Sequence, residues 1–246
     1  MVNESSAMRV AIIHPWFPQY RREFFERLVG RAALEGIRVD VFHGDPPPEW
    51  QERGDAVETD YARALPTRFI PVRGRSLVLK DLTAVRRTGP YDLIVVEQAV
   101  RNLETYRLLA GSGRLAFWGH GRTYTESVSR AQERLKQWLT RRGEWFFSYT
   151  PGGVQAVTAA GFDSARTTVV QNTLDTTALK ADLAAVTDGE VADFRRAHGL
   201  TAHTALFIGG LDAPKRIPFL LAAADVAHAR DPRFRLVIAG KGAHAP

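Results

Sequence analysis

The strongest constraint in this sequence is a regular alternation of short apolar runs with segments of helical spacing. The apolar runs predict strands at residues 9–14, 37–43, 68–72, 91–97, 114–118, 145–149 and 167–171. Helices are predicted over residues 18–35, 77–87, 102–109, 123–142 and 151–160, and residues 44–66 form an acidic, proline-rich loop that is extended at residues 46–48. Apolar strands separated by helices are typical of a parallel sheet covered on both faces. We therefore expect an α/β, doubly wound, Rossmann-like domain over residues 1–172.

A second strand–helix series follows a connector at residues 173–200, in which one short helix is expected at residues 190–198. The series predicts a strand at 204–208, a helix at 215–230 and a strand at 235–239. One β-α-β unit takes about 30 residues or more, so residues 201–246 hold one such unit and little else. Two parallel strands do not enclose a core, and we expect the rest of this domain to be missing or supplied by another chain.

The composition narrows the classes of function. The absence of cysteine excludes disulfides, thiolate metal sites and cysteine nucleophiles. Lys and Arg number 33 against 27 Asp and Glu, a net charge of +6 that suits phosphate-bearing ligands, an anionic membrane or nucleic acid. No apolar run approaches the ~18 residues of a membrane span, and the polar start is not that of a signal peptide. We expect a cytoplasmic protein, with peripheral contact at the inner membrane face as an alternative.

Several familiar signatures do not occur. The histidines lack metal-ligand spacing, no serine-hydrolase elbow is present, and no nucleic-acid-binding signature appears. The first strand–helix loop, residues 14–22, contains no glycine, which disfavours NAD or FAD binding. We expect no metal, no cofactor and no nucleic-acid partner.

Two loops in the first series contain candidate site residues. The loop at residues 14–22 is bulky and basic, and Tyr20 and Arg21 are candidates for contact with an acceptor; alternatively, Trp16 and Phe17 of this loop pack as a lid over the core. His120 lies between two glycines after a predicted strand, where its near-neutral pKa suits a catalytic role; alternatively, it is an ordinary loop histidine. Glu97 and Arg122 are further acceptor-side candidates.

The turn at residues 207–216 is a candidate anion site. Gly209 and Gly210 follow a predicted strand, where the backbone can approach a ligand closely. Lys215 and Arg216 lie near the start of the next helix, where free N–H groups favour a diphosphate. The sequence is not a P-loop, because the glycine–lysine–hydroxyl ending is absent. An ordinary turn with two solvated cations is the alternative.

The predicted helix that ends at residue 142 is basic and amphipathic. It carries Arg130, Arg134, Lys136, Arg141 and Arg142 beside Leu135, Trp138 and Leu139. Such a helix either lies on an anionic membrane or is a solvated surface helix.

These stretches, in this order, resemble the retaining GT-B glycosyltransferases of the large bacterial family four, which includes lipopolysaccharide and exopolysaccharide mannosyl- and glucosyltransferases. The matching stretches are residues 17–21 (FPQYR) with 24–25 (FF), 118–121 (WGHG), 149–153 (YTPGG), 169–175 (VVQNTLD), 207–211 (FIGGL) with 215–216 (KR), and 236–240 (LVIAG). The resemblance implies a complete N-terminal Rossmann-like domain followed by the first β-α-β unit of a second one.

By this resemblance the protein transfers a hexose from a nucleotide-diphosphate sugar to a glycan or lipid-linked acceptor with retention of configuration, in cell-surface polysaccharide synthesis. Lys215 would meet the donor diphosphate, Gly209 and Gly210 would form its close-approach loop, and His120 would contact the donor sugar or the acceptor. Many members have arginine where this chain has Gly210, and Arg216 is expected to substitute for it.

The chain departs from the family near its end. The family's paired-glutamate motif is absent, and residues 240–246 differ from the usual Gly-Asp-Gly. We therefore expect a truncated chain that is inactive, or nearly so, by itself. The alternatives are a noncatalytic acceptor-binding or membrane-docking subunit and an inactive fragment that needs a partner chain.

Overall fold

The computed structural model describes residues 7–72, 74–111, 113–124 and 129–243. The chain divides into two compact units, the first comprising residues 1–46 and 57–174 and the second residues 47–56 and 175–246. The domain boundaries expected at residues 172 and 200 stay predictions.

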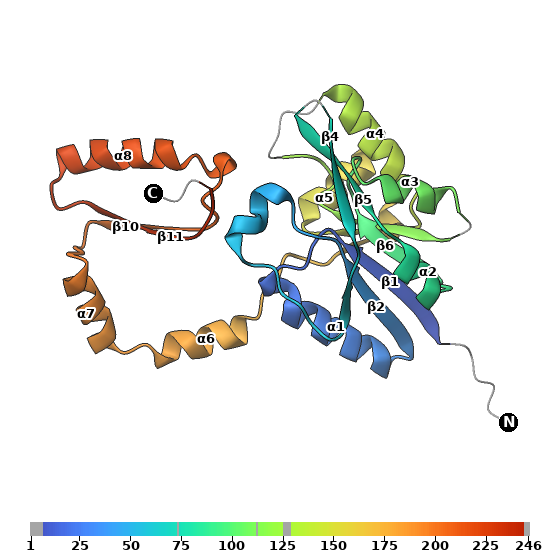
Figure 1. Cartoon of the computed structure of the whole chain (residues 1–246), viewed down its shortest axis with the longest axis horizontal. Helices are drawn as coiled ribbons and strands as arrows, with labels where there is room; N and C mark the ends of the chain where they lie inside the picture. The colour runs from blue at the N-terminus through green and yellow to red at the C-terminus, as the bar shows by residue number, and fades with distance from the viewer. Residues whose placement is uncertain (1–6, 73, 112, 125–128, 244–246) are drawn as a thin grey trace. The chain divides into compact units, whose positions relative to one another are not determined.

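The first unit is built on a seven-stranded parallel sheet (Figure 1). Its strand order is β3 (Ala62–Ala64), β2 (Ile37–His43), β1 (Met8–His14), β6 (Leu93–Glu97), β7 (Leu115–Gly119), β8 (Trp145–Ser148) and β9 (Thr167–Val169). Each neighbouring pair is parallel. The expected α/β, doubly wound sheet is confirmed, whereas β3 lies in a segment that was expected to be a loop.

The direction in which strands are added reverses between β1 and β6. The chain first adds β2 and β3 on one side of β1 and then returns to add β6, β7, β8 and β9 on the other side. Because crossover connections are right-handed, this reversal places the helices of the two halves on opposite faces. Helix α1 (Arg22–Leu34) covers one face, and α3 (Leu103–Leu109), α4 (Arg130–Thr140) and α5 (Pro151–Ala159) cover the other.

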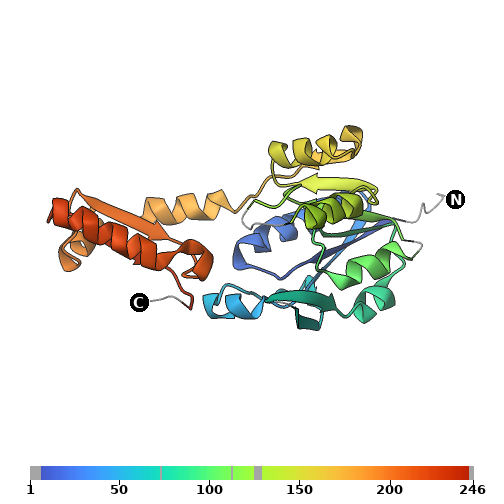
Figure 2. The ribbon, with the colours of Figure 1, turned by 90° about the horizontal axis from the view of Figure 1, so that it is seen from above.

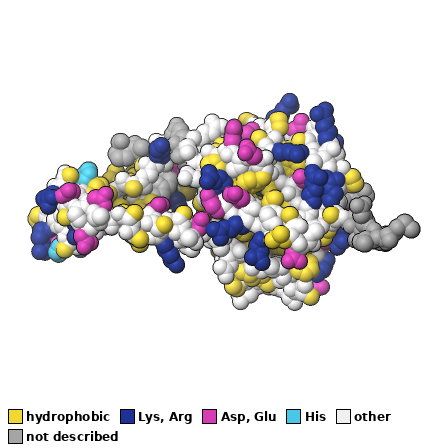
Figure 3. Space-filling model, turned by 90° about the horizontal axis from the view of Figure 1, so that it is seen from below, with side chains coloured by type: hydrophobic (Ala, Val, Ile, Leu, Met, Phe, Trp, Pro, Cys, Tyr) yellow, Lys and Arg dark blue, Asp and Glu magenta, His cyan; other side chains and the backbone are white. Residues whose placement is uncertain are grey.

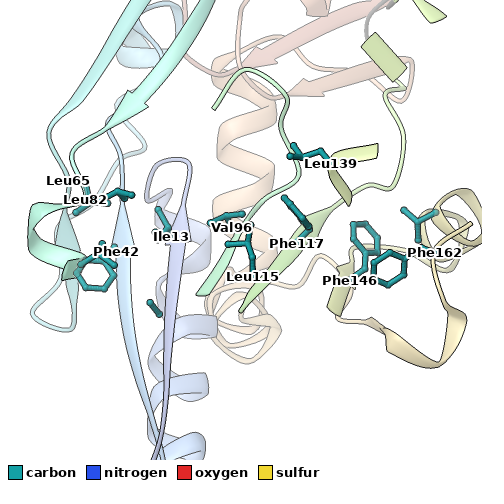
Figure 4. Close-up of a cluster of buried hydrophobic side chains, with 13 residues drawn as sticks. Ile13, Phe42, Leu65, Leu82, Val96, Leu115, Phe117, Leu139, Phe146 and Phe162 are labelled. Atoms are coloured by element: carbon teal, nitrogen blue, oxygen red, sulfur yellow. The ribbon is translucent and has the colours of Figure 1, made fainter. Parts of the chain in front are cut away.

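Successive residues of the central strands contribute side chains to two separate hydrophobic cores, one on each face of the sheet. Ile13, Val96 and Phe117 belong to the cluster beneath α4 and α5, which also holds Leu139 and Phe146 (Figure 4). The opposite cluster contains Ile12, Val95, Ala116 and Trp118 with Phe25 of α1. Alternation of side chains along each strand therefore gives both faces of the sheet an apolar layer.

The helix expected over residues 77–87 is wrong in its first half. Residues 67–72 and 75–80 form an antiparallel pair, β4 (Thr67–Val72) and β5 (Arg75–Lys80), and only α2 (Thr83–Thr88) is helical. Long-range contacts hold β5 extended, because the Val78 amide donates to the Arg101 carbonyl at 2.9 Å and Lys80 pairs with Glu104 at 2.8 Å. The spacing of apolar residues in the local sequence gives no sign of these long-range contacts.

Two other expectations change in detail. Helix α4 begins at Arg130 rather than at residue 123, because Ser129 and Gln132 form a capping box at its start. Residues 125–128 of that expected helix lie outside the described residues. Pro48 was expected to be extended and instead begins a short 3-10 helix, η2 (Pro48–Arg53).

The second unit contains the expected β-α-β arrangement. Strands β10 (Thr204–Ile208) and β11 (Arg235–Ala239) are parallel, and α8 (Ile217–Arg230) lies along them (Figure 2). Two helices precede the strands rather than one, α6 (Thr176–Ala185) and α7 (Asp188–Ala197), each capped by the side chain before it, Asp175 or Thr187. Much apolar surface of this unit is exposed, including 73% of Ile208 and 62% of Phe219.

None of the helices in the described part of the chain is long and apolar enough to cross a membrane. On the face drawn in Figure 3, basic and acidic side chains are interspersed, with hydrophobic side chains between them.

Candidate functional site

A small hollow lies at the point where the strand order reverses. It is lined by the ends of β1 and β6, from Ile12 to Pro15 and from Val95 to Glu97, and by Trp118 and Tyr149. In open α/β sheets, ligands bind outside the carboxyl ends of the strands at such a reversal. The hollow has a volume of about 10 Å³, which is close to the space that one water molecule needs. It can therefore receive a single polar group of a ligand and not a sugar ring.

His14 gives this hollow a hydrogen-bond acceptor. Its Nδ1 lies 2.6 Å from the Trp16 carbonyl oxygen, which can only accept, so Nδ1 carries the proton. Burial lowers the pKa of His14 to about 4, although the bond to Trp16 acts in the opposite direction. The imidazole is therefore neutral at physiological pH, and its buried Nε2 has a lone pair with no partner among the described residues.

Trp118 supplies a donor beside this acceptor. Its side chain packs edge-on against His14, with ring centroids 6.4 Å apart. The buried indole Nε1–H has no hydrogen-bond partner in the described part of the chain. A hydroxyl group or a water molecule could accept from Trp118 and donate to His14, since each can do both.

The loop at residues 14–22 combines packing residues with site residues. Trp16 and Phe17 are buried, as the packing alternative requires. Tyr20 is 46% exposed, whereas Arg21 is 1% exposed and lies against the rings of Tyr20, Phe24, Trp118 and Tyr149. Contact of Tyr20 and Arg21 with an acceptor stays a prediction.

His120 is exposed and stacks on Tyr149, with ring centroids 4.5 Å apart. Burial, followed by the charges of Lys136 and Arg21, lowers the pKa of His120, which favours its neutral form. Burial also raises the pKa of Tyr149 to about 12, so this phenol keeps its proton. Both rings are therefore neutral hydrogen-bonding groups at neutral pH.

The loop that carries His120 is held by buried contacts. Gln98 accepts from the Gly121 amide at 3.0 Å and donates to the Thr140 hydroxyl at 2.7 Å. Gly121 has a φ of 80°, and a Cβ on it would lie 2.3 Å from the Gly153 carbonyl oxygen. Glycine is required at position 121 for both reasons, and the backbone beside His120 is fixed.

The remaining acceptor-side candidates lie near this group. Glu97 lines the hollow and accepts from the Asn102 amide at 3.2 Å. Arg122 is exposed and stacks on Tyr124, with its guanidinium carbon 4.7 Å from the ring centre. Tyr124 in turn faces the edge of His120, with ring centroids 6.5 Å apart.

The donor-binding candidates lie in the second unit. Gly209 follows β10 with a φ of 156°, a backbone conformation that side chains disfavour. The helix expected from residue 215 begins at Ile217, because Arg216 has a left-handed backbone with a φ of 54°. Lys215 ends a 3-10 turn, η4 (Ala213–Lys215), and both Lys215 and Arg216 are exposed next to the start of α8.

The sequence-based site did not include His14, Trp118, Tyr149, Lys136 or Asn172. Four of these residues, His14, Trp118, Tyr149 and Asn172, end or directly follow predicted strands, the position where ligands bind in α/β sheets, and that signal could have identified them. Lys136 and Asn172 are distant in sequence from the loop at residues 14–22, and no local pattern connects them to it. Among the described residues, no group of three or more His, Asp or Glu side chains could hold a metal ion.

No protein-family model matches this sequence, and no curated protein matches it. Solved structures do match over 94% of the chain. They include UDP-GlcNAc 2-epimerase from Methanocaldococcus jannaschii (12% identity, TM-score 0.51), Anabaena HepE in complex with UDP and glucose (14%, 0.56), and S. aureus MnaA with UDP (13%, 0.53). The chain spans 73%, 60% and 62% of those chains, respectively. At these identities the comparison shows the fold alone, an α/β fold of the Rossmann-like, GT-B kind.

Proposed function

We propose that this chain is part of an enzyme that acts on a nucleotide-diphosphate sugar. The observation that carries the proposal is the small hollow at the reversal between β1 and β6, where α/β sheets bind ligands. The fold likeness adds support, because HepE is solved with UDP and glucose and MnaA with UDP. The chain spans 60% of HepE and 62% of MnaA, so their full activities come to this chain only as proposals.

The reaction we propose is transfer of a hexose to a glycan or lipid-linked acceptor with retention of configuration. The ordered motifs shared with family four glycosyltransferases support transfer over other sugar-nucleotide chemistry. Lys215 and Arg216 would hold the leaving diphosphate, and His120 would orient the sugar or the acceptor hydroxyl. Such catalysis depends on positioning the substrates and on stabilising the departing charge.

Epimerisation of the nucleotide sugar is a second candidate, favoured by the likeness to a UDP-GlcNAc 2-epimerase. The two reactions give different products when the protein is incubated with UDP-GlcNAc and followed by proton and phosphorus NMR. Transfer consumes the nucleotide sugar and releases UDP only with an acceptor present. Epimerisation forms a second UDP-sugar without an acceptor.

Peripheral membrane contact through α4 remains a proposal. Leu135 and Trp138 of this helix are 41% and 39% exposed, and Arg142 stacks on Trp138 at 4.3 Å. An exposed apolar strip beside arginines suits an anionic lipid surface. Sedimentation with vesicles containing phosphatidylglycerol should recover the protein, and replacing Trp138 by alanine should reduce the bound fraction.

The donor assignment is tested by calorimetry with UDP and GDP. The Lys215→Ala variant should bind the preferred diphosphate at least about ten-fold more weakly, because a charge-assisted phosphate contact is lost. Lys180→Ala removes another exposed lysine of the same unit and should leave the affinity unchanged. Equal affinities for both variants would exclude Lys215 from the diphosphate site.

A further inference from the structure

Arg21 is a buried cation in the first unit with an incomplete set of partners. It is 1% exposed, and it forms no ion pair with any carboxylate that the structure describes. Its Nη2 donates to the Asn172 side-chain oxygen at 2.6 Å. Its Nε and Nη1 are buried and have no hydrogen-bond partner among the described residues.

The aromatic rings around Arg21 stabilise its positive charge but do not provide hydrogen-bond acceptors for all of its N–H groups. Its guanidinium carbon lies 5.1 Å from the ring centre of Tyr149 and 5.9 Å from that of Trp118. Contact with a ring face stabilises the charge, whereas the N–H groups lie in the guanidinium plane and need acceptors. A buried polar group without such an acceptor is costly, and a charged one more so. The Tyr149 hydroxyl lies close enough to Arg21 for a hydrogen bond that acts to lower the pKa of the phenol, against the larger effect of burial. Nε and Nη1 still have no acceptor among the described residues.

The surroundings favour an anion as that acceptor. Lys136 and Arg21 both lie close enough to His120 for their charges to lower its pKa, after the larger effect of burial. Two carboxylates, Glu133 and Glu97, act on Lys136, and they already accept from Gln137 and Asn102, respectively. Tyr20, His120 and Asn172, which border Arg21 or its partners, are exposed. A ligand that reaches these side chains lies next to a cation with unused donors.

We propose that Arg21 recognises an anionic group, a phosphate or a carboxylate, on the sugar acceptor. Guanidinium is suited to both, because its planar donors match their oxygens. The inference rests on the proposed function and narrows its acceptor to anionic molecules, such as phosphate-bearing lipid-linked glycans or uronic-acid sugars. It assigns the donor diphosphate to a different place, the turn at residues 209–216.

The test is calorimetry of the full chain with glucose 6-phosphate, glucuronate and glucose as probes. Wild-type protein should bind at least one anionic sugar ten-fold or more tightly than glucose, and the preferred probe tells phosphate from carboxylate. Arg21→Gln should abolish this preference, whereas Arg22→Gln, at the adjacent and more exposed arginine, should retain it. Equal binding of the three sugars by wild-type protein would overturn the proposal, because water would then be the hydrogen-bond acceptor for the Arg21 Nε and Nη1 groups.

Two further variants cover the case in which Arg21→Gln does not fold. Arg21→Lys keeps the charge and loses the planar fork, and Asn172→Ala changes an exposed side chain that holds Nη2. Both should weaken anionic-sugar binding several-fold and leave the affinity for UDP or GDP unchanged. A parallel loss of nucleotide affinity would assign Arg21 to the donor instead. Absence of nucleotide binding to wild-type protein would contradict the proposed function. The preference for anionic sugars is measured without nucleotide, so its failure can be distinguished from failure of the proposed function.

Discussion

His14 has a protonation state that folding imposes on it. In the folded chain its pKa is about 4 because it is buried, whereas an unfolded histidine titrates near 6.5. Between these values the unfolded state binds the extra proton, so the free energy of unfolding rises with pH across this window. Below about pH 4 both states are protonated and this dependence ends.

Urea unfolding between pH 7 and pH 4 measures this contribution. We expect His14 to account for a loss of up to about 3 kcal/mol as the pH falls, because folding lowers its pKa from 6.5 to about 4. His14→Asn, whose amide can still donate to the Trp16 carbonyl, should flatten the pH dependence by that amount. A variant with the same slope as wild-type protein would show that His14 is not the titrating group.

Gly121 is a residue whose replacement has two separate costs. Alanine at this position would require a left-handed backbone, worth roughly 1–2 kcal/mol, and would also clash with the Gly153 carbonyl. Gly36 has a similar φ of 71° with open space around its Cβ position. Chemical denaturation should therefore show a clearly larger loss for Gly121→Ala than for Gly36→Ala, whose loss should stay near the backbone cost alone. Equal losses would mean that the loop can move away from α5.

The environments of His14 and Gly121 could not be predicted from the sequence. The glycines around His120 indicated a special turn, but not that Gly153, far along the chain, closes it. The proposed diphosphate role of Lys215 depended on local features alone, a glycine-rich turn before a helix. Arg21 was identified as a candidate, but two of the four rings that surround it, those of Trp118 and Tyr149, come from segments far along the chain.

At the scale of elements, an ion pair fastens β5 to α3. Lys80 and Glu104 are each 2% exposed, and the Glu104 carboxylate also accepts from the Lys80 amide at 3.3 Å. Removing one member of a buried pair leaves an uncompensated charge and typically costs about 3–5 kcal/mol. Replacing both with apolar side chains avoids that charge.

A double-mutant cycle tests this connection. Glu104→Leu should lower the free energy of unfolding by about 3 kcal/mol or more, and the added Lys80→Met should recover most of the loss. The measurement is urea denaturation of the two single variants and the double variant. Additive losses would indicate that the pair is not coupled in solution.

The same pair helps to explain why β5 is a strand although its sequence predicted a helix. Residues 77–79 are apolar in a run, and a short apolar run fits a strand or a helix equally well. Residues 75–80 form a strand because they contact Glu104, Arg101 and the partner strand β4. The long strands of the central sheet were predictable because each combines an apolar run with flanking turn signals, and β3, with three residues, was too short to produce one.

At the scale of the whole molecule, the two units differ in the core they contain. Both hydrophobic clusters belong to the first unit. In the second unit, the buried apolar side chains of the described residues are those of Leu211 and Ile217. Stability in a protein follows local burial, so the two units should open with different free energies. The order of the strand–helix series predicted the strands of both units, because that pattern is local in sequence, whereas no local signal places residues 47–56 in the second unit.

Hydrogen exchange followed by mass spectrometry measures this difference. Amides of β1, β6 and β7 should be protected for hours, whereas those of α6 and α7 should exchange at least about a hundred-fold faster, because their apolar side chains are exposed. Uniform protection across both units would contradict the description of the second unit as poorly packed.

Whether this chain binds a nucleotide-diphosphate sugar is decided by the same exchange experiment with UDP-glucose or GDP-mannose added. We expect slower exchange at residues 209–220, where Lys215, Arg216 and the start of α8 would meet the diphosphate. Unchanged exchange at these residues with saturating amounts of both nucleotide sugars would contradict it.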